Sequence, residues 1–526
     1  MEYCADFETT TNPDDCRVWA WAVCEIGNPN NFHYGNSLDT FMQFMENSDN
    51  STFYFHNLKF DSEFIFVWLF EHGFKHIIKK PPEGANEKLD YENEASKTFT
   101  TLISNMGQFY ASKIIFEKGT KRSRFAKLYD SLKVLPFKVS EIAKAFNLPM
   151  SKLEIDYDAN REVGHELSEE EIAYIRNDVT IVAMALDVLH RQGLKRITQG
   201  SNAMHDFQQR FGEREFLRKF PLLRPEDDKD IRQCYKGGFT YVNSKYEGKD
   251  IKTGLVLDVN SLYPWAMRYC KLPYGRPVYF EGKYEPDRLY DQYIQMFTCQ
   301  FDLKEGHIPT IQIKGNLRYF VPTEYLETSC DVAVTLCMTN VDLELMMEHY
   351  EILNPVWHGG WKFKSTTGLF SEYIDHWVNE KIKASREGNK SMRTLAKLML
   401  NALYGKFATT INVASKNPFY DDGKIGYEVP SEIKIVDGKK KRVPLYEQGK
   451  YYYLPVGAFV TAWARHKTIT SAQKMYDHFC YADTDSLHLD LDLPQEILDM
   501  DEDELEALTT ETLRKYGVGI PDDFFR

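Results

Sequence analysis

The sequence predicts an α/β multidomain protein, and three observations support this prediction. The chain has 526 residues, which is more than a single domain usually holds. Short apolar segments at residues 3–7 and 254–258 have the length and side chains of β-strands. Residues 167–190 instead form a long helical pattern, which opens with a capping box between Ser168 and Glu171.

Composition restricts the location and partners of the chain. The sequence is 43% hydrophobic and 14% aromatic, so sizeable cores can form, and no apolar run approaches the length of a membrane span. We expect no signal peptide, and the nine cysteines are scattered and contain no C-x-x-C pair. We therefore expect a cytoplasmic protein in a reducing compartment, with no membrane partner and no structural zinc.

The net charge of −14 does not by itself exclude nucleic acid as a partner. Residues 490–526 include 12 acidic and 3 basic residues, so much of the negative charge is local. Basic clusters occur at residues 118–124 and 439–442. Local patches of this kind govern nucleic-acid binding more than the total charge does.

Residues 1–199 are predicted to form an α/β domain in which acids converge. Asp6 and Glu8 interrupt an apolar strand and share one of its faces, because side chains alternate along a strand. Asp61 ends a second apolar segment, residues 53–61, which also resembles a strand. Each acid alone would more often be a solvated surface charge.

The long helix adds a fourth acid and a tyrosine. Tyr174 and Asp178 lie four residues apart and therefore share a helix face. Converging acids beside a tyrosine suit a nuclease in which two metal ions bind the scissile phosphate and the hydroxyl orients the attacking water. Lys152 could neutralise phosphate charge, although an exposed lysine and a core tyrosine are the ordinary interpretations.

A second acidic centre is predicted in the C-terminal half. Asp483 and Asp485 lie two residues apart between apolar segments, so on a single strand they would share a face. Asp258 ends a distant strand, and two strands that each end in Asp suit a two-metal phosphoryl-transfer centre with Mg²⁺. The alternative is a polar turn. Residues 461–465 are expected to begin a helix that packs beneath the Asp483 strand.

Residues 390–408 are predicted to form an amphipathic helix with a polar face. On that face Arg393, Lys397, Asn401 and Tyr404 follow one another at spacings of four, four and three. Two cations, an amide and an aromatic ring suit a nucleoside triphosphate, because the cations match phosphate charge. The alternative is a helix whose polar face is simply solvated.

Two shorter motifs extend this interpretation. Tyr263 follows Asp258 closely, and a tyrosine there can stack beneath a sugar and exclude a 2′-hydroxyl. The glycine pair after Tyr235, which ends at Gly238, permits the close approach of another backbone, although an ordinary turn explains it equally well.

Two segments are predicted to interrupt the C-terminal half as insertions. Residues 270–369 are rich in Pro, Tyr and Gly and contain one expected helix, 340–350. Residues 409–452 carry turn signals at 421–423 and 437–438 and predict a β-hairpin insertion.

Taken together and in order, these motifs resemble those of the protein-primed family B DNA polymerases of small phages, of the phi29 type. The resemblance covers residues 1 to about 490 and rests on the following motifs: D-F-E-T-T from Asp6, H-N-L-K-F-D from His56, Y-D-S-L from Tyr129, Y-x-x-x-D from Tyr174, Y-x-G-G from Tyr235, D-V-N-S-L-Y-P from Asp258, L-A-K-L-M-L-N-x-L-Y-G-K-F from Leu395, T-A-W-A-R from Thr461 and Y-x-D-T-D-S from Tyr481.

The resemblance implies an RNase H-like 3′–5′ proofreading exonuclease domain followed by a right-hand polymerase. The implied divisions are the exonuclease domain at 1–199, the first part of the palm at 200–269, a terminal-protein-binding insertion at 270–369, the fingers at 370–408, a hairpin insertion for processivity and strand displacement at 409–452, and the second part of the palm at 453–526.

The resemblance also implies roles for individual residues, with two Mg²⁺ or Mn²⁺ ions in each active site. The exonuclease residues would be Asp6, Glu8, Asp61 and Asp178 as metal ligands, assisted by Tyr174 and Lys152. The polymerase metal centre would comprise Asp258, Val259 and Asp485, with Asp483 beside them. The incoming dNTP would contact Ser261, Leu262, Tyr263, Lys397, Asn401 and Tyr404. The DNA-binding residues would be His56, Asn57, Phe60, Ser131, Leu132, Tyr235, Gly238, Thr461 and Arg465.

The implied partners are primer–template DNA, single-stranded DNA and a terminal protein whose hydroxyl primes synthesis. The chain would replicate a viral or mobile-element genome, in the host cytoplasm if a phage encodes it.

One region departs from the family pattern. Family members continue after the D-T-D strand with further palm, a K-x-Y motif that grips the primer end, and a small thumb. None of these is recognised after Ser486, and Lys515–Tyr516 lacks the intervening residue and the context. His376 occupies the position of a family lysine in the fingers. We therefore expect a truncated product, or a split polymerase with a second polypeptide that supplies thumb and primer grip, rather than a minimal form.

Two other functions are weighed against the polymerase. The exonuclease acids are complete in themselves, so the chain could be a 3′–5′ exonuclease only. It could also be a non-catalytic module that holds DNA or terminal protein. Intact Asp258, Asp483, Asp485, Lys397 and Tyr263 disfavour the non-catalytic module.

Overall fold

The computed structural model describes residues 1–526 except for 13, 49, 81–85, 158, 313–324, 437, 502, 503, 506, 522, 523, 525 and 526. The chain divides into two compact units. The first comprises Met1–Asp206, His376–Ala402 and Thr410–Lys450, and the second comprises Phe207–Asp375, Leu403–Thr409 and Tyr451–Arg526. Each unit is described by itself.

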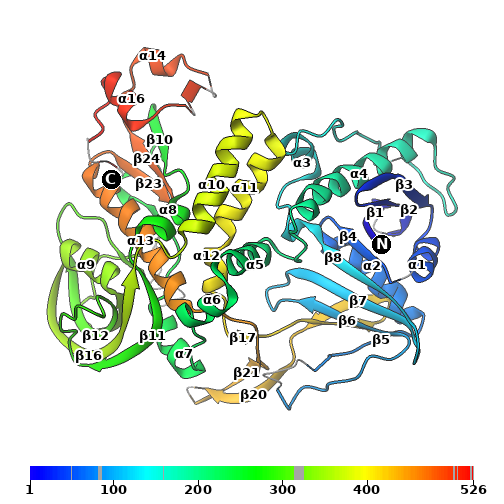
Figure 1. Ribbon diagram of the computed structural model, residues 1–526, viewed down its shortest axis with the longest axis horizontal. Coiled ribbons are helices and arrows are strands. Elements are labelled where there is room, and N and C mark those ends of the chain that lie inside the picture. The colour runs from blue at the N-terminus through cyan, green and yellow to red at the C-terminus, as the bar shows by residue number, and fades with distance from the viewer. Residues whose placement is uncertain are drawn as a thin grey trace. The chain divides into compact units, whose positions relative to one another are not determined.

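The first unit is built on an eight-stranded mixed sheet in the order β3-β2-β1-β4-β8-β7-β6-β5 (Figure 1). β1 is antiparallel to β2 and parallel to β4, so the N-terminal strand lies inside the sheet. The strands are β1 Glu2–Thr9, β2 Val18–Glu25, β3 Asn28–Gly35, β4 Thr52–Phe55, β5 Lys75–His76, β6 Thr98–Ile103, β7 Phe109–Lys118 and β8 Ser123–Asp130.

Helices cover both faces of this sheet. α4 (Glu169–Arg191) packs on β1, β2 and β3, as Figure 1 shows. Ala5 and Phe7 face the opposite side and join a core with Phe41 and Phe55. Alternation along β1 therefore leaves Asp6 and Glu8 on the side of α4. The other helices here are α1 Leu38–Asn47, α2 Leu58–Glu71, α3 Val139–Ala145 and the 3₁₀ turn Ser131–Lys133.

The predicted ends of α4 are confirmed, whereas the predicted strand at 53–61 is partly wrong. Ser168 accepts a hydrogen bond from the Glu171 N–H at the N-terminus of α4, and both halves of the capping box form. β4 ends at Phe55, and a left-handed Asn57 then turns the chain into α2. Asp61 therefore lies in the first helical turn and not at the end of a strand.

The later segments of the first unit are helical and then hairpin-like. α11 (Lys390–Ala402) packs on α3 and α4, and Thr394 donates a hydrogen bond to the Ala145 carbonyl at 3.1 Å. The insertion predicted at residues 409–452 forms three antiparallel pairs of strands. Asp437, which belongs to one of the turns expected there, lies outside the described residues. The strands are β17 Asn412–Val413, β18 Asn417–Asp421, β19 Lys424–Glu428, β20 Ser431–Val436, β21 Lys439–Pro444 and β22 Glu447–Gln448.

The second unit contains a four-stranded sheet in the order β10-β24-β23-β9. The buried helix α13 (Leu454–Lys474) packs against β23 and β24, as expected, but it begins seven residues before Thr461. Leu513, Val518 and Ile520, from the C-terminal part of the chain, join the same core. The strands are β9 Thr240–Val242, β10 Gly254–Asp258, β23 Phe479–Asp483 and β24 Ser486–Asp490, and the C-terminal helices are α14 Gln495–Leu498 and α16 Thr510–Lys515.

A second sheet of this unit, in the order β11-β16-β12-β15, corresponds to the predicted insertion at 270–369. The helix predicted at 340–350 is confirmed as α9 (Asn340–His349), which packs on β12, β15 and β16. The strands are β11 Leu272–Glu281, β12 Gln292–Leu303, β13 Ile311–Gln312, β14 Tyr325–Leu326, β15 Val334–Thr339 and β16 Tyr350–Thr366.

Shorter helices complete the chain. α5 (Gln199–Phe211) and α10 (Ser371–Arg386) each continue from one unit into the other. The remaining helices are α6 Glu213–Lys219, α7 Pro225–Arg232, α8 Leu262–Tyr269, α12 Tyr404–Phe407 and the 3₁₀ turn Ser244–Tyr246. Among the described residues, no helix combines the length and apolar character that crossing a bilayer requires.

Candidate active sites

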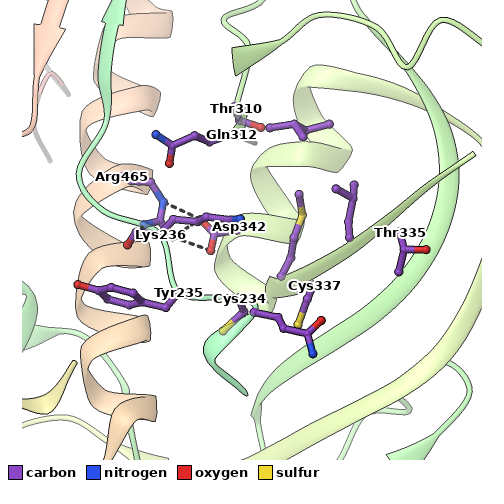
Figure 2. Close-up of a pocket in the computed structure, with 13 residues that line it drawn as sticks. Cys234, Tyr235, Lys236, Thr310, Gln312, Thr335, Cys337, Asp342 and Arg465 are labelled. Atoms are coloured by element: carbon purple, nitrogen blue, oxygen red, sulfur yellow. Dashed lines mark hydrogen bonds and ion pairs between the residues drawn. The ribbon is translucent and has the colours of Figure 1, made fainter. Parts of the chain in front are cut away.

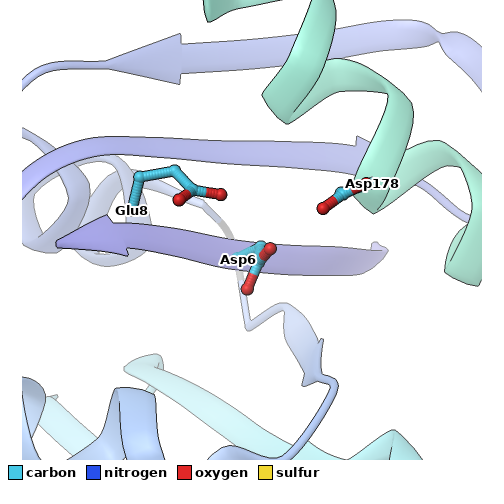
Figure 3. Close-up of side chains that lie close together, drawn as sticks. All are labelled: Asp6, Glu8 and Asp178. Atoms are coloured by element: carbon cyan, nitrogen blue, oxygen red, sulfur yellow. The ribbon is translucent and has the colours of Figure 1, made fainter. Parts of the chain in front are cut away.

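Three predicted acids of the first unit meet between β1 and α4. Asp6 and Glu8 project from one face of β1, and Asp178 projects toward the same space from α4 (Figure 3). One carboxylate oxygen from each of the three lies within 4.8 Å of the other two. Strand alternation and the position of α4 on the sheet thus bring together side chains that are 170 residues apart in sequence.

The electrostatics of this cluster favour bound cations. Burial, reinforced by the charge of Asp178, raises the pKa of Asp6 to about 7. Burial and the neighbouring charge of Asp6 raise the pKa of Glu8 to about 8. Asp61 is only 2% exposed, and burial raises its pKa as well. One buried oxygen each of Asp61 and Asp178 has no hydrogen-bond partner among the described residues. Hard oxygen donors with this excess of negative charge fit Mg²⁺ or Mn²⁺.

A lysine and two tyrosines border the cluster. Lys152 Nζ lies 3.0 Å from Asp178 Oδ2; burial alone lowers the lysine pKa, but this ion pair raises it overall. The Tyr174 hydroxyl lies 2.7 Å from that of Tyr157, and burial raises the pKa of Tyr174. Sequence reasoning missed Tyr157, which is 50% exposed; its closeness to Lys152 in the sequence was the available signal.

The irregular segment that carries Lys152 and Tyr157 is fastened to α4. Arg161 Nε donates to Glu171 at 2.8 Å, and the guanidinium lies 4.0 Å from the ring centre of Trp19. Burial alone would raise the pKa of Glu171. Hydrogen bonds from the Ser168 N–H, His165 and Arg161 instead lower this pKa to about 2. Glu171 precedes Tyr174 by three residues, so one helix holds both the anchor of the segment and the acid–tyrosine pair.

Two of the predicted DNA-binding residues make structural contacts. His56 Nδ1 lies 3.0 Å from Ser131 Oγ, and His56 Nε2 donates to the Phe137 carbonyl at 2.7 Å. Ser131 is buried and donates its hydroxyl to the Phe55 carbonyl at 3.0 Å. Burial lowers the pKa of His56, so the neutral ring is favoured. These contacts hold the end of β4 against β8.

The neighbouring residues are more accessible. The Asn57 N–H donates to Asp130 Oδ1 at 3.1 Å, and the same oxygen accepts from the Leu132 N–H at 3.0 Å. The Asn57 side chain is exposed and Leu132 is half-buried. Phe60, 49% exposed, packs edge-on against Phe64. An exposed aromatic ring of this kind offers a platform for a base.

The acids of the second unit lie in a tight hairpin. Asp483 ends β23 and Ser486 begins β24, so Asp485 lies in the turn and does not share a strand face with Asp483; the sequence prediction was wrong on this point. The Asp485 N–H donates to the Asp483 carbonyl at 2.7 Å. The Val259 N–H donates to the Asp485 carbonyl at 2.8 Å, and Asp258 stands opposite Ser486. The turn thus lies directly beside the end of β10.

Gly238 is required beneath this turn. The Thr484 N–H donates to the Phe239 carbonyl at 2.8 Å, and a Cβ added to Gly238 would lie 2.6 Å from Thr484 Oγ1. The close approach predicted at the glycine pair involved another backbone, whereas the group nearest to Gly238 is the Thr484 side chain. Burial, then the nearby Tyr404, raises the pKa of Tyr235.

Two predicted nucleotide-binding tyrosines stack on each other. Ser261 has a left-handed backbone (φ 63°) and caps α8, and the Leu262 side chain is buried. The rings of Tyr263 and Tyr404 are 3.9 Å apart at their centres with an interplanar angle of 22°. Burial, followed by the effect of Tyr404, raises the pKa of Tyr263.

The predicted cationic helix face belongs to the first unit and ends before Tyr404. α11 ends at Ala402, and Tyr404 begins a separate short helix in the second unit. Lys397 and Asn401 are exposed on α11. Burial, then the charges of Arg393 and Lys397, lowers the pKa of Lys381 on α10, so three cations converge. Sequence reasoning missed Lys381, because no periodicity links it to α11.

Thr461 and Arg465 are committed to contacts within the protein. Thr461 is buried and donates to the Ala458 carbonyl at 3.1 Å within α13. Arg465 donates through Nε and Nη2 to Asp342 at 2.7–3.0 Å and through Nη1 to the carbonyls of Lys236 and Gly237 at 2.8 and 2.7 Å. DNA binding by these two residues stays a prediction.

The Arg465–Asp342 pair lines a cavity of about 310 Å³ in the second unit (Figure 2). Lys236, Cys234 and Gln312 line it from other segments. Burial, then the charge of Arg465, lowers the pKa of Lys236. The sequence did not indicate a role for Asp342, because its partner Arg465 is 123 residues away.

Comparisons with known proteins agree with this architecture. Residues 42–503 match the family described as DNA polymerase type B, organellar and viral. The chain is 48% identical over 488 residues to a DNA polymerase of Bacillus phage Nf and 44% identical to that of Bacillus phage phi29; in both cases the match covers 93% of this chain and 79% of the relative.

Solved structures of phi29 DNA polymerase are similar throughout. A complex with single-stranded DNA matches with a TM-score of 0.81 and 42% identity over 95% of this chain and 81% of that one. A complex with primer–template DNA and incoming nucleotide substrates also matches with a TM-score of 0.81 and 42% identity, over 95% of this chain and 82% of that one. The mixed α/β multidomain fold is therefore that of phi29 DNA polymerase.

The fold and its acidic centres thus define a DNA polymerase. The chain belongs to the family B DNA polymerases of the organellar and viral type, and within them to the protein-primed phage enzymes related to phi29 DNA polymerase.

Proposed function

We propose that this polymerase extends DNA primers at the Asp258–Asp485 centre and removes 3′-terminal nucleotides at the Asp6–Glu8–Asp178 centre. One observation carries the proposal: each unit presents carboxylates from separate elements at one place, together with tyrosines suited to a nucleotide substrate. The likeness to phi29 polymerase bound to single-stranded DNA, primer–template DNA and nucleotides supports the same substrates here.

The chain would divide as a right-hand polymerase with an RNase H-like exonuclease domain. We assign the exonuclease to 1–199, the palm to 200–269 and 453–526, the fingers to 370–408, a terminal-protein-binding insertion to 270–369, and a processivity and strand-displacement insertion to 409–452.

In the exonuclease centre, Asp6, Glu8, Asp61 and Asp178 would hold two Mg²⁺ or Mn²⁺ ions, which when bound neutralise the phosphate and activate water. The unpartnered buried oxygens of Asp61 and Asp178 support this assignment. Tyr174 would orient the attacking water through its hydroxyl. Lys152, which the ion pair keeps protonated, would neutralise charge on the scissile phosphate.

In the polymerase centre, Asp258, Asp485 and the Val259 carbonyl would hold the metal ions, with Asp483 beside them. Tyr263 would lie under the sugar of the dNTP, flanked by Ser261 and Leu262, and Tyr404 would separate from it to admit the substrate. The triphosphate would meet the cations of α10 and α11, because phosphate oxygens accept charge-assisted hydrogen bonds. The cations are Lys381, Arg393 and Lys397, and the neutral amide of Asn401 would contact the nucleotide beside them.

The DNA would be held by both units. Phe60, Asn57 and Leu132 would contact a single-stranded 3′ end, and His56 and Ser131 would position them. Near the palm, Tyr235, Gly238, Thr461 and Arg465 would shape the primer–template surface. A terminal protein would prime synthesis through a hydroxyl, and replication of a phage genome would take place in the host cytoplasm.

Primer extension tests the proposal. The purified chain is incubated with a labelled primer on a template, Mg²⁺ and dNTPs, and we expect template-dependent elongation that EDTA stops. Asp485→Ala should abolish elongation, whereas Asp490→Asn, at the far end of the same hairpin, should leave it unchanged. Elongation that survives Asp485→Ala would remove this carboxylate from the centre.

A further inference from the structure

Two cysteines from segments far apart in the sequence line the cavity of about 310 Å³ in the second unit, as Figure 2 shows. Cys234 lies in the turn that follows α7 and is 1% exposed, whereas Cys337 lies in β15 and is half-buried. Both are free thiols, and neither takes part in the two reactions proposed above. Two thiols that share a cavity without a disulfide form a candidate site of oxidation.

The two thiols face each other, and the fold makes the pair specific. A hydrogen bond with the Cys337 thiol, and then burial, raises the pKa of the Cys234 thiol, so the two sulfur atoms lie close together. Leu336 and Met338 belong to the core that β15 shares with α9, so alternation along the strand turns Cys337 away from that core. Cys299, the cysteine of the neighbouring strand β12, is buried in the same core. The geometry therefore pairs Cys337 with Cys234 and not with Cys299.

The two cysteines differ in how easily an oxidant reaches them. The raised pKa keeps Cys234 protonated at neutral pH, and a protonated thiol is a poor nucleophile. Cys337 is half-buried and also lines a second cavity, of about 80 Å³, on the other side of β15. A small oxidant therefore meets Cys337 first, and Cys234 is placed to react with the oxidised product.

We propose that Cys234 and Cys337 form a reversible disulfide on exposure to hydrogen peroxide, and that this bond slows primer extension. The Cys337 thiolate attacks one peroxide oxygen, the O–O bond breaks, and the released hydroxide takes up the thiol proton as water. The Cys234 sulfur then attacks the sulfenic acid of Cys337, the S–O bond breaks, and a second water leaves with the Cys234 proton. Two electrons pass from the sulfur pair to the peroxide, and a dithiol reductant reverses the bond. Disulfides in a reducing cytoplasm are typically transient in this way.

The effect on extension follows from what the Cys234 end of the chain is attached to. Residues 234–239 form neither helix nor strand, and Arg465 Nη1 donates to two of their carbonyls at 2.8 and 2.7 Å. The Phe239 carbonyl accepts a hydrogen bond from the Thr484 N–H at 2.8 Å, in the turn that carries Asp485. Drawing the two sulfurs together to about 2 Å pulls this segment toward β15, and small displacements of reacting groups slow a reaction strongly. This part of the inference rests on the proposed function, because it takes Asp485 as part of the extension centre.

Peptide mapping and primer extension test the two parts separately. The purified chain is treated with hydrogen peroxide, free thiols are alkylated, and mass spectrometry of the digest identifies linked peptides. We expect a Cys234–Cys337 link, a loss of extension of about tenfold, and recovery of both thiols and activity with dithiothreitol. Degradation of single-stranded DNA should stay within about twofold, because its acids lie in the first unit.

Three single variants serve as matched controls. Cys234→Ser and Cys337→Ser each remove one thiol of the pair and should make extension insensitive to peroxide. Cys330→Ser removes an exposed thiol of the same unit and should respond as wild type does.

The outcomes separate the disulfide from its effect. A Cys337 sulfinic acid without the linked peptide would overturn the pairing, and a reversible loss that persists in Cys337→Ser would assign the sensitivity to another thiol. A quantitative disulfide with full extension activity would overturn the effect on extension. Reduced wild-type chain that extends no primer would instead overturn the proposed function, while the peptide map still decides whether the two cysteines join.

Discussion

The two acidic centres contain the same kind of residue and are held in different ways. In the first unit, the acids lie on a sheet face beneath α4, where burial raises the pKa values of Asp6, Glu8 and Asp61. In the second unit, Asp258 and Asp483 are exposed, and backbone hydrogen bonds fix a hairpin turn beside β10. The electrostatics of buried carboxylates therefore dominate the first centre, whereas the geometry of one turn dominates the second.

The largest expected effect separates the two centres. Asp6→Ala with Glu8→Ala removes two carboxylates of the first cluster and should reduce 3′–5′ degradation of single-stranded DNA by at least about a thousandfold. Primer extension should stay near the wild-type rate, because no acid of the second unit changes. Release of nucleotides from labelled oligonucleotides measures the loss. Degradation that survives the double substitution would mean that the exonuclease has been assigned to the wrong residues.

The next effect tests the tyrosine pair of the second unit. Tyr263→Val removes the ring that would exclude a 2′-hydroxyl, so use of ribonucleotides relative to deoxyribonucleotides should rise about a hundredfold. Tyr263→Phe keeps the ring and should keep the discrimination. Single-nucleotide insertion with matched rNTP and dNTP measures the ratio. Unchanged sugar discrimination in the valine variant would exclude the gate role.

A smaller effect tests the turn geometry. Gly238→Ala places a Cβ 2.6 Å from Thr484 Oγ1, so the turn must shift and extension should fall about tenfold or more. Degradation should not change. Gly519→Ala, where a Cβ meets open space in the same unit, is the control and should be silent. Full extension activity in Gly238→Ala would show that this turn tolerates displacement.

The ion pair that anchors the Lys152–Tyr157 segment to α4 should affect the exonuclease activity and not primer extension. Arg161→Met removes the ion pair with Glu171, and we expect degradation of single-stranded DNA to fall about tenfold through kcat, with extension unaffected. Arg161→Lys should recover part of the rate. Arg191→Met, which breaks an exposed pair on the same helix, should have no effect. Loss of both activities would indicate general destabilisation instead of positioning.

The smallest expected effect is on how the thermal stability of the first unit depends on pH. Carboxyls with raised pKa hold protons in the folded state that the unfolded chain releases, so without metal the first unit should lose stability as pH rises from about 5 to 8. Asp6→Asn with Glu8→Gln should flatten this dependence. Thermal unfolding in EDTA at both pH values measures it. A wild-type midpoint that rises with pH would contradict the raised pKa values.

Local patterns predicted the elements that are governed by local physics. The capping box of α4 and the hairpins of the 409–452 insertion formed where cap and turn residues predicted them, and the helix expected at 340–350 formed as α9. The strand–helix change after Phe55 was missed, because a run of aromatic residues suits either element and the left-handed Asn57 leaves no pattern. Asp483 and Asp485 looked like one strand face for a different reason: a tight hairpin turn lies between them, and the left-handed backbone of Thr484 (φ 58°) leaves no pattern in the sequence.

The sequence by itself determined the identity and order of the motifs, and with them the family and the acids of both centres. Only the tertiary structure decided that the Tyr157 hydroxyl meets that of Tyr174 and that Lys381 lies near the cations of α11. It also decided that Asp342 accepts hydrogen bonds from Nε and Nη2 of Arg465. The reason is physical. Spacing along one helix or strand fixes which side chains share a face, whereas contacts between distant segments depend on how whole elements pack.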